Sequence, residues 1–403
     1  MSRTFEIVVV GGGVSGLSIA LLLAHSRHAD RFHLRLLDAA ERPVFDPGSD
    51  IALRVSAISP GSRSILEVGG AWSGILQQRV SPYEHMRVWD ESAEPDGPAT
   101  LRFDADRLAV PQLGYIVENC LLQHGLLSVL DESGVDLQFA TALHAVEESG
   151  NGRLLQLDNG MKWSADLVIA ADGARSAIRT AAGIGVATYD YSQTAFVTHL
   201  VSELPHQRTA WQRFLRSGPL ALLPLADGRV STVWSTSQAQ AEQAASVSDA
   251  ELGELLTEAS GGVLGRLEVA GPRGRFPLIA QHAREYVRPG LVLIGDAAHS
   301  IHPLAGQGAN LGLADAATLA TLIDDAVGRG EYPGDRPVLR RYERSRRGEN
   351  ELMMQSLTGL NRLFASDSGA LGELRNAGMR LFNHAGPLRD YIARVALGAR
   401  RSQ

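Results

Sequence analysis

Residues 5–26 read "FEIVVVGGGVSGLSIALLLAHS": an apolar run, a glycine cluster and then a periodic apolar stretch. The run Ile7–Val10 predicts a buried strand of a parallel sheet, and the apolar repeat that begins at Leu17 predicts a helix. Between them, the pattern G-x-G-x-x-G is formed by Gly11, Gly13 and Gly16. A strand, this loop and a helix in that order predict a dinucleotide-binding site.

Each glycine of the loop has a separate physical task. The first permits the tight turn, the second lets a pyrophosphate approach the backbone, and the third allows the helix to pack closely on the strand. The next apolar segment, "FHLRLLD", ends in Asp38 about 20 residues further on, where a carboxylate can accept the hydroxyls of a ribose. The alternative is a glycine-rich turn that only packs two elements together.

Two later segments repeat the pattern of an apolar strand that ends in aspartate and glycine. Residues 165–184, "ADLVIAADGARSAIRTAAGI", place Asp172 and Gly173 at a strand end, and residues 291–310, "LVLIGDAAHSIHPLAGQGAN", place Gly295 and Asp296 at another. Because strand ends of one parallel sheet lie together, the three segments predict one long ligand that is held from three parts of the chain.

Composition narrows the classes of function. The 403 residues carry a net charge of −7, so no basic excess supports nucleic-acid binding. A single cysteine, Cys120, excludes an intrachain disulfide and indicates a reducing compartment. No apolar run reaches the roughly 18–20 residues that span a bilayer. We therefore expect a cytoplasmic protein.

Three stretches carry a resemblance to a known family: "LRVSAISPGSRSIL" (53–66), "RFLRSGPLALLPLADGRVSTVW" (213–234) and "GDAAHSIHPLAGQGANLGLADAATLA" (295–320). With the G-x-G-x-x-G loop, they resemble the para-hydroxybenzoate hydroxylase-like flavoprotein monooxygenases, and among these the FAD-dependent ubiquinone-biosynthesis hydroxylases. The resemblance covers nearly the whole chain. It implies an α/β fold in which a Rossmann-like FAD-binding domain with a parallel sheet is interleaved with a mostly antiparallel substrate-domain sheet and followed by a helical C-terminal region.

The expected domains alternate along the chain. The FAD-binding domain takes 1–83, 105–183 and 276–345, the substrate domain takes 84–104 and 184–275, and the helical region takes 346–403. Within the substrate domain, "ADGR" between two apolar runs predicts a hairpin turn, and "SVSDAELGELLTEAS" predicts a helix.

The resemblance also implies which residues bind non-covalent FAD. Arg54 is expected at the pyrophosphate or the ribityl chain, and Asn119 and Asp296 at the ribityl chain; a surface ion pair is the alternative for Arg54. Asp172 is expected at the cofactor, unless Asp172–Gly173 is a plain strand-end turn. The remaining members of the set are Gly295, Asn310 and the loop beside the flavin ring, with Pro303, Gly306, Gln307 and Gly308.

Two histidines stand in the third segment, His299 and His302. Their spacing is poor for zinc and no carboxylate or cysteine cluster accompanies them, so no metal is expected. Packing or hydrogen bonding beside the cofactor is the favoured interpretation, and a direct catalytic base is the alternative. No acid–base residue is identified, because the chemistry is centred on the flavin.

The resemblance implies hydroxylation of an aromatic ring with O₂ and NADPH or NADH, through a flavin C4a-hydroperoxide, on a polyprenylated phenol of ubiquinone biosynthesis. A pocket for the ring is expected from Phe214, Leu222, Pro224 and Trp234, although a core beneath the sheet is the alternative for each. The amphipathic tail Ser356–Leu397 either packs as a domain or forms a surface for the inner membrane or a partner in a biosynthetic complex.

Three other functions stay open. One is a catabolic hydroxylase of a small soluble aromatic acid, for which Arg213 and Arg216 are candidate carboxylate ligands. The others are a flavin-dependent oxidase or reductase of a different substrate, and a flavin-binding accessory protein.

Overall fold

The structure, a computed structural model, describes residues 3–301, 308–364, 369–386, 389–390 and 394. Its first half is built on a six-stranded sheet with the order β19-β20-β12-β1-β2-β8. All neighbours are parallel except β19 and β20. The strands are β1 (Phe5–Val10), β2 (Phe32–Leu37), β8 (Asp136–Gln138), β12 (Leu167–Ala170), β19 (Val287–Arg288) and β20 (Leu291–Leu293).

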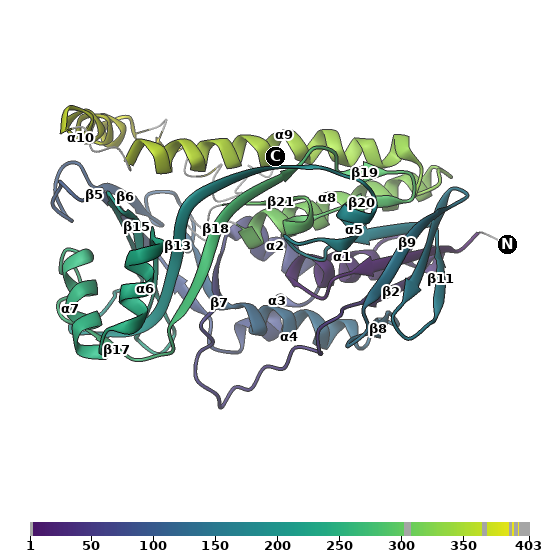
Figure 1. The fold of residues 1–403 in the computed structure, drawn as a ribbon, viewed down its shortest axis with the longest axis horizontal. Helices are drawn as coiled ribbons and strands as arrows, with labels where there is room; N and C mark the ends of the chain where they lie inside the picture. The colour runs from purple at the N-terminus through teal and green to yellow at the C-terminus, as the bar shows by residue number, and fades with distance from the viewer. Residues whose placement is uncertain (1–2, 302–307, 365–368, 387–388, 391–393, 395–403) are drawn as a thin grey trace.

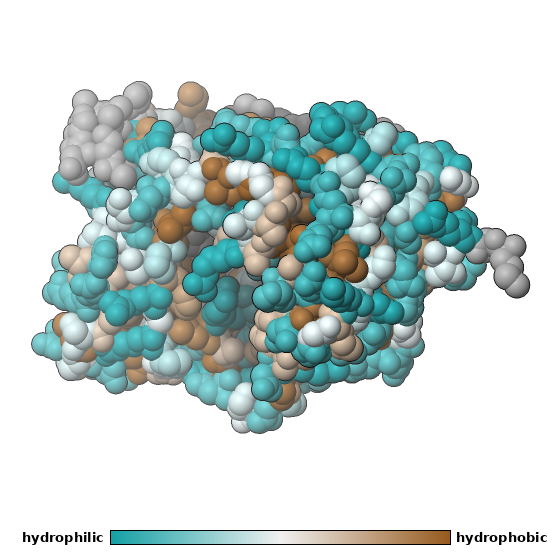
Figure 2. Space-filling model, turned by 45° about the vertical axis from the view of Figure 1, so that its right-hand side comes forward, coloured by the Kyte–Doolittle hydropathy of each residue, from teal (hydrophilic) through white to brown (hydrophobic). Residues whose placement is uncertain are grey.

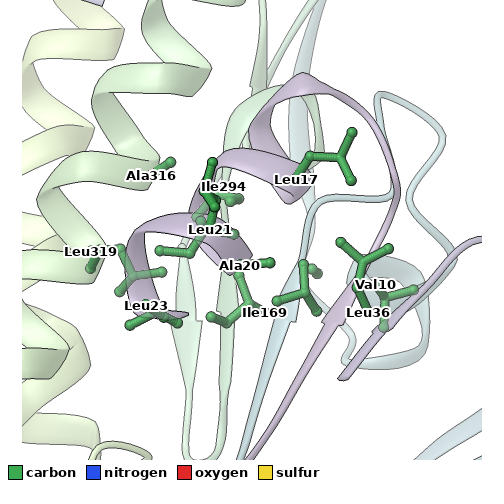
Figure 3. Close-up of a cluster of buried hydrophobic side chains, with 14 of the residues drawn as sticks. Val10, Leu17, Ala20, Leu21, Leu23, Leu36, Ile169, Ile294, Ala316 and Leu319 are labelled. Carbon is green, nitrogen blue, oxygen red and sulfur yellow. The ribbon is translucent and has the colours of Figure 1, made fainter. Parts of the chain in front are cut away.

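Helices cover this sheet because its strands are apolar on both faces. Every residue of β12 and β20 is buried. Helix α1 lies between the sheet and α8, and Figure 3 shows Leu21 and Leu23 of α1 beside Ala316 and Leu319 of α8. The helices of this half are α1 (Val14–Ala24), α2 (Pro60–Val68), α3 (Trp72–Leu76), α4 (Asn119–Leu130), α5 (Ala177–Ala181) and α8 (Gly308–Gly328).

Two small sheets extend this half. One has the order β3-β7-β4 and delivers the chain into α4, and the other has the order β11-β10-β9. Their strands are β3 (Val55–Ile58), β4 (Ser81–Tyr83), β7 (Gly114–Glu118), β9 (Leu143–Ser149), β10 (Gly152–Leu157) and β11 (Lys162–Ala165). Single 3-10 turns lie at Ala29–Arg31 and Gly295–Ala297.

The second half is a nine-stranded sheet with the order β21-β18-β13-β16-β15-β14-β5-β6, and β17 also pairs with β13. It is antiparallel except where β14 runs parallel to β5. The strands are β5 (His85–Asp90), β6 (Leu101–Asp104), β13 (Val186–Ser202), β14 (Thr209–Leu215), β15 (Gly218–Pro224), β16 (Val230–Ser237), β17 (Leu267–Val269), β18 (Gly274–Ala283) and β21 (His299–Ser300). The expected mixture of a parallel and a mostly antiparallel sheet is confirmed.

The two faces of the nine-stranded sheet differ. Helices α6 (Gln238–Ser246) and α7 (Asp249–Ala259) cover one face, and α7 begins with a capping box of Ser248 and Glu251. The other face turns toward the first half: the space beside Gly274 is occupied by Leu53, and the Arg54 guanidinium lies 5.8 Å from the Phe276 ring centroid. The predicted hairpin turn and the predicted helix are both present.

Helix α9 (Arg336–Phe364) joins the two halves and runs along the top of the view in Figure 1. Its first half buries Tyr342 in the core of the parallel sheet, and its second half packs Leu357 on the nine-stranded sheet. It runs unbroken through residue 346, where the sequence suggested a boundary. Helix α10 (Gly369–His384) follows it. Among the described residues, no helix is both long and apolar enough to cross a membrane.

Candidate cofactor and substrate site

The glycine loop leaves space only where a ligand would need it. Gly11 has φ +116°, and a Cβ there would collide with the carbonyl oxygen of Ala171. A Cβ on Gly16 would collide with the carbonyl oxygen of Gly11. A Cβ on Gly13, in contrast, would meet no atom of the described residues within 4 Å. The first and third glycines therefore serve packing, and the second faces open space beside the start of α1.

The N-terminus of α1 is suited to an anion. Gly13 is its N-cap, no side chain caps it, and no acidic residue lies in its first turn. Free N–H groups and the positive end of the helix dipole thus face the space beside Gly13. Gln123 donates to the Gly12 carbonyl at 2.9 Å and holds the loop from α4. Asp38 lies beside this loop and accepts from the N–H groups of Gly12 and Ala40.

Arg54 and Asn119 lie side by side. The Asn119 N–H donates to the Arg54 carbonyl at 3.0 Å, and the Asn119 side-chain oxygen accepts from Ser56 at 2.7 Å. The Arg54 side chain is exposed, and no carboxylate of the described residues lies within salt-bridge distance of it. Its neighbours are the Phe276 ring and, through charge, Asp296. The structure thus gives no support to a surface ion pair.

The two carboxylate oxygens of Asp172 differ: one caps a turn, and the other has no hydrogen-bond partner among the described residues. Its Oδ2 accepts from the Ile178 N–H at 3.2 Å, and Gly173 has φ +83°. Its Oδ1 is buried and has no hydrogen-bond partner among the described residues. A buried acceptor without a partner is costly unless a ligand or water satisfies it.

Gly295 and Asp296 form the turn that follows β20. Gly295 has φ +55°, and its N–H donates to Asp315 at 3.0 Å. The Asp296 side chain touches solvent, yet protein lies around it on most sides. Desolvation by that protein raises the pKa of its carboxyl, and the charges of His299 and Arg54 oppose the rise. Asp296 is therefore placed to accept a hydrogen bond from a ligand that fills the space.

The start of α8 is fixed by Asn310. Its side-chain oxygen accepts from the Ser59 N–H at 2.9 Å, and its amide donates to the Ala57 carbonyl at 2.8 Å. Gly308 begins the helix, and none of the described residues lies within 4 Å of the position that its Cβ would take. The other predicted loop residues, Pro303, Gly306 and Gln307, and also His302, lie outside the described residues.

His299 is buried and belongs to an ionic cluster that the sequence did not reveal. Its Nε2 lies 2.5 Å from Asp315 of α8, which also accepts from Arg346 of α9 at 2.7 Å. Burial alone would raise the pKa of Asp315, but the charges and hydrogen bonds of His299 and Arg346 hold it at about 2. The carboxylate is therefore ionised. The described residues contain no group of three or more His, Cys, Asp or Glu side chains arranged to hold a metal.

Three of the four residues predicted for the substrate pocket lie on the core face of the sheet, which is the alternative that the sequence left open for each of them. Leu222 and Trp234, each 1% exposed, belong to the core under α6 and α7, on the face of the sheet away from the cofactor segments. Pro224 follows Leu222 by two residues, so strand alternation puts it on that same face. Phe214 lies on the opposite face, where it stacks on Phe364 at 4.0 Å.

Alternation assigns other residues to the face that looks toward the cofactor segments. Ala221 and Val233 are direct cross-strand partners between the buried pairs, and Gln212 pairs with Ala221. Val197 pairs with Val233. These residues were missed, although the register of the predicted hairpin could have identified the β15–β16 pair. Figure 2 shows the surface hollowed near the middle of the visible face, where hydrophilic and hydrophobic side chains meet.

The geometry fits FAD. Among the described residues, the site offers open space at Gly13, an uncapped helix start, an acceptor of Asp172 without a partner and the accessible carboxylate of Asp296, all at the carboxyl ends of parallel strands. In that arrangement, α1 would hold the pyrophosphate and Asp38 the ribose, while Asp296, Arg54 and Asn119 would lie toward the ribityl chain.

Comparisons with known proteins agree. Residues 4–356 match the family model described as FAD binding domain. The chain is 37% identical to 3-demethoxyubiquinol 3-hydroxylase of Escherichia coli, over 98% of each chain. It is 34% identical to the mouse mitochondrial ubiquinone biosynthesis monooxygenase COQ6, over 97% of this chain and 90% of the relative.

The fold is also found among solved structures. The p-nitrophenol 4-monooxygenase PnpA of Pseudomonas putida superposes with a TM-score of 0.76 at 19% identity, over 98% of this chain and 97% of that one. Fold, site and family match together define a FAD-dependent monooxygenase. Within that class, the chain belongs to the family of the ubiquinone-biosynthesis hydroxylases.

FAD, once bound, supplies the redox chemistry that joins NAD(P)H oxidation to insertion of one oxygen atom from O₂ into an aromatic ring. The residues of the chain would bind and orient the cofactor. The α1 N-terminus would neutralise phosphate charge, Asp296 would accept a hydrogen bond, and the nine-stranded sheet would exclude water from one side.

Proposed function

We propose that the protein hydroxylates the ring of a prenylated phenol or quinol in ubiquinone biosynthesis, using O₂ and NAD(P)H. The names of the relatives support an aromatic quinol substrate. The proposal that the substrate carries a prenyl tail is supported by an apolar cluster between the nine-stranded sheet and helices α9 and α10. We call it the α9 cluster. Its members are Met86, Val88, Leu101, Phe214, Ile301, Met353, Leu357, Phe364 and Met379.

The position of the α9 cluster is the observation that carries the proposal. Ile301 immediately precedes 302–307, the segment expected beside the flavin ring, so the cluster begins next to the expected reaction site. Methionines such as Met86 and Met353 adapt their shape to flexible apolar partners. A prenyl tail that lies there would extend the ring-binding site without requiring a charged group.

The arginines considered for a small aromatic acid do not reach this face. The Arg213 guanidinium donates to the carbonyl groups of Glu258, Ala259 and Glu91, on the side of α7. Arg216 is exposed and pairs with Glu91 at 2.7 Å. Neither offers a carboxylate clamp beside the cofactor segments, which argues against the catabolic alternative.

The same proposal includes a peripheral position at a membrane, where prenylated substrates reside. Leu352, Leu360 and Leu363 are exposed and recur on one side of α9, and Leu381 is 73% exposed on α10. Within 336–403, arginines outnumber acidic residues, although the whole chain is acidic. An apolar stripe with basic surroundings suits an anionic lipid surface.

The test compares phenols that carry zero to three isoprene units, with NAD(P)H-dependent product measured by mass spectrometry. Each buried methylene contributes about 0.8 kcal/mol, so the first isoprene unit should raise kcat/KM by at least about tenfold. Efficient turnover of a small hydroxybenzoate, with activity lost as the tail lengthens, would overturn the proposal.

Substitutions at two adjacent residues of α9 can test the binding of the prenyl tail and the binding to a membrane separately. Met353 is half-buried in the α9 cluster, and Leu352 is 66% exposed. Met353→Glu should remove the gain per isoprene unit and leave binding to phosphatidylglycerol vesicles intact. Leu352→Glu should weaken vesicle binding and keep the gain. Equal effects of the two variants on both measurements would contradict the assignment of the prenyl tail to one side of α9 and of the membrane to the other.

A further inference from the structure

Asp315 is a wholly buried carboxylate with both oxygens in use. Its Oδ2 accepts from the Gly295 N–H at 3.0 Å and lies 2.5 Å from His299 Nε2. Its Oδ1 accepts from Arg346 Nε at 2.7 Å and from the Asn350 amide at 3.2 Å. One side chain of α8 thus ties together α9, β21 and the turn after β20.

That turn is part of the cofactor site. Gly295 immediately precedes Asp296, and a Cβ on Gly295 would crowd the Ser15 hydroxyl of the glycine loop. Gly312 of α8 also approaches the Ser15 hydroxyl, and a Cβ on Gly312 would lie 3.6 Å from the Gly295 Cα. The Asp315 carboxylate therefore acts on a junction at which the first and third cofactor segments touch.

Stability alone gives a weak reason for this cluster. Burying an ion pair costs desolvation energy, and well-packed apolar residues of similar volume are often at least as stabilising. A buried carboxylate differs from an apolar side chain because its directional hydrogen bonds fix several donors at defined positions. Here one of those donors is the N–H of a residue with φ +55°, next to Asp296.

We propose that Asp315, braced by Arg346 and His299, is a positioning residue for FAD. It holds the Gly295–Asp296 turn in its left-handed conformation against the glycine loop, and so sets where the Asp296 carboxylate meets the cofactor. Asp315 itself does not touch the reacting atoms. Without its charge, the turn would sample other conformations and FAD binding would have to select one of them.

The chain contains a matched control on the same helix. Asp324 is 4% exposed, and it also binds one arginine and one histidine: Arg27 Nε at 2.7 Å and His28 Nδ1 at 2.8 Å. It further accepts from the His28 N–H at 3.0 Å. Its partners follow the C-terminal end of α1, so this cluster ties helices together without contacting a cofactor segment.

The experiment compares Asp315→Asn with Asp324→Asn as apoproteins. FAD is titrated by fluorescence at a temperature at which circular dichroism shows both variants fully folded. Asp315→Asn should weaken FAD binding about ten- to hundredfold, the range for losing one or two hydrogen bonds to a charged group. It should also change the visible circular dichroism of the bound flavin. Asp324→Asn should lower the melting temperature and leave both FAD readouts unchanged.

Wild-type FAD affinity and flavin spectrum in folded Asp315→Asn would overturn the proposal, as would equal losses in the two variants. Should Asp315→Asn not fold, Arg346→Lys and Arg27→Lys replace the pair. Lysine keeps the positive charge but cannot bridge Asp315 and Asn350 as the guanidinium does. Arg346→Lys should then weaken FAD binding several-fold and Arg27→Lys should not; equal affinity in these two variants would likewise reject the proposal.

Discussion

The six-stranded parallel sheet and the nine-stranded sheet contribute to the candidate site in different ways. At the parallel sheet, backbone groups do most of the work: glycines 11, 13 and 16 shape the loop, and the start of α1 presents N–H groups. At the nine-stranded sheet, the alternating direction of the side chains decides which residues face the cofactor segments and which form the core. The glycine loop tolerates no added atoms at its packed positions, Gly11 and Gly16, whereas at the nine-stranded sheet the effect of a substitution depends on which face the residue occupies.

The largest expected effect is at Gly16. Gly16→Val would push a branched side chain into the Gly11 carbonyl and the Ala171 side chain, so we expect a loss of more than about 3 kcal/mol in the free energy of unfolding. Urea unfolding of the purified apoprotein measures it. Wild-type stability would show that the loop is looser than a backbone site should be.

The next effect concerns the sheet face. Trp234→Ala removes a 1% exposed ring from the core under α6 and α7, and should cost about 3–5 kcal/mol of folding stability. The neighbouring Val233→Ala, on the other face, should cost about 1 kcal/mol or less and change KM for the aromatic substrate instead. A raised KM in Trp234→Ala with full stability would reverse the assignment of the faces.

Gly13→Val should weaken FAD binding without changing the stability of the apoprotein. No atom of the part of the chain that the structure describes lies within 4 Å of its Cβ position, so the apoprotein should unfold at the wild-type urea concentration. The side chain would instead fill the space of the pyrophosphate and weaken FAD binding at least about a hundredfold, or roughly 2.7 kcal/mol. Purified Gly13→Val that retains yellow FAD in full would contradict the site.

The smallest effect is the acid dependence of Asp315. Its pKa is held at about 2, below the ordinary value of 3.8, so its stabilisation is complete above about pH 5 and is lost as the pH falls toward 2. The shift corresponds to about 2 kcal/mol. The stability difference between wild type and Asp315→Asn should therefore shrink by that amount between pH 5 and pH 2, and a constant difference would show that the pKa of Asp315 is not lowered in the folded protein.

The cofactor half was predictable because its requirements appear as particular residue types. A loop that has no room for Cβ atoms needs glycine at those positions, and strands that are buried on both faces appear in the sequence as continuous apolar runs. The placement of residues 302–307 stays a prediction. Asp315 and Arg346 escaped notice because no local motif joins them; their contact arises only when α9 packs on α8.

The substrate half was less predictable for a physical reason. Residues 220–225, "LALLPL", are apolar on both faces, because one face meets α6 and α7 while the other meets the first half of the chain. Alternation therefore separates Leu222 from Leu223 but does not say which of them is inside. Only the packing of α6 and α7 decides it, and that packing is a long-range property.

The interleaved order of the strands also has a consequence for biosynthesis. Strand β12 needs β20 as its neighbour, and β20 leaves the ribosome roughly 120 residues later, which takes about 6–24 s at usual elongation rates. During that interval the nascent chain exposes an apolar strand edge of the kind that aggregates. The third cofactor segment also emerges only in the last third of translation. We therefore expect flavin capture to be a late event that cannot be completed until this segment has been synthesised.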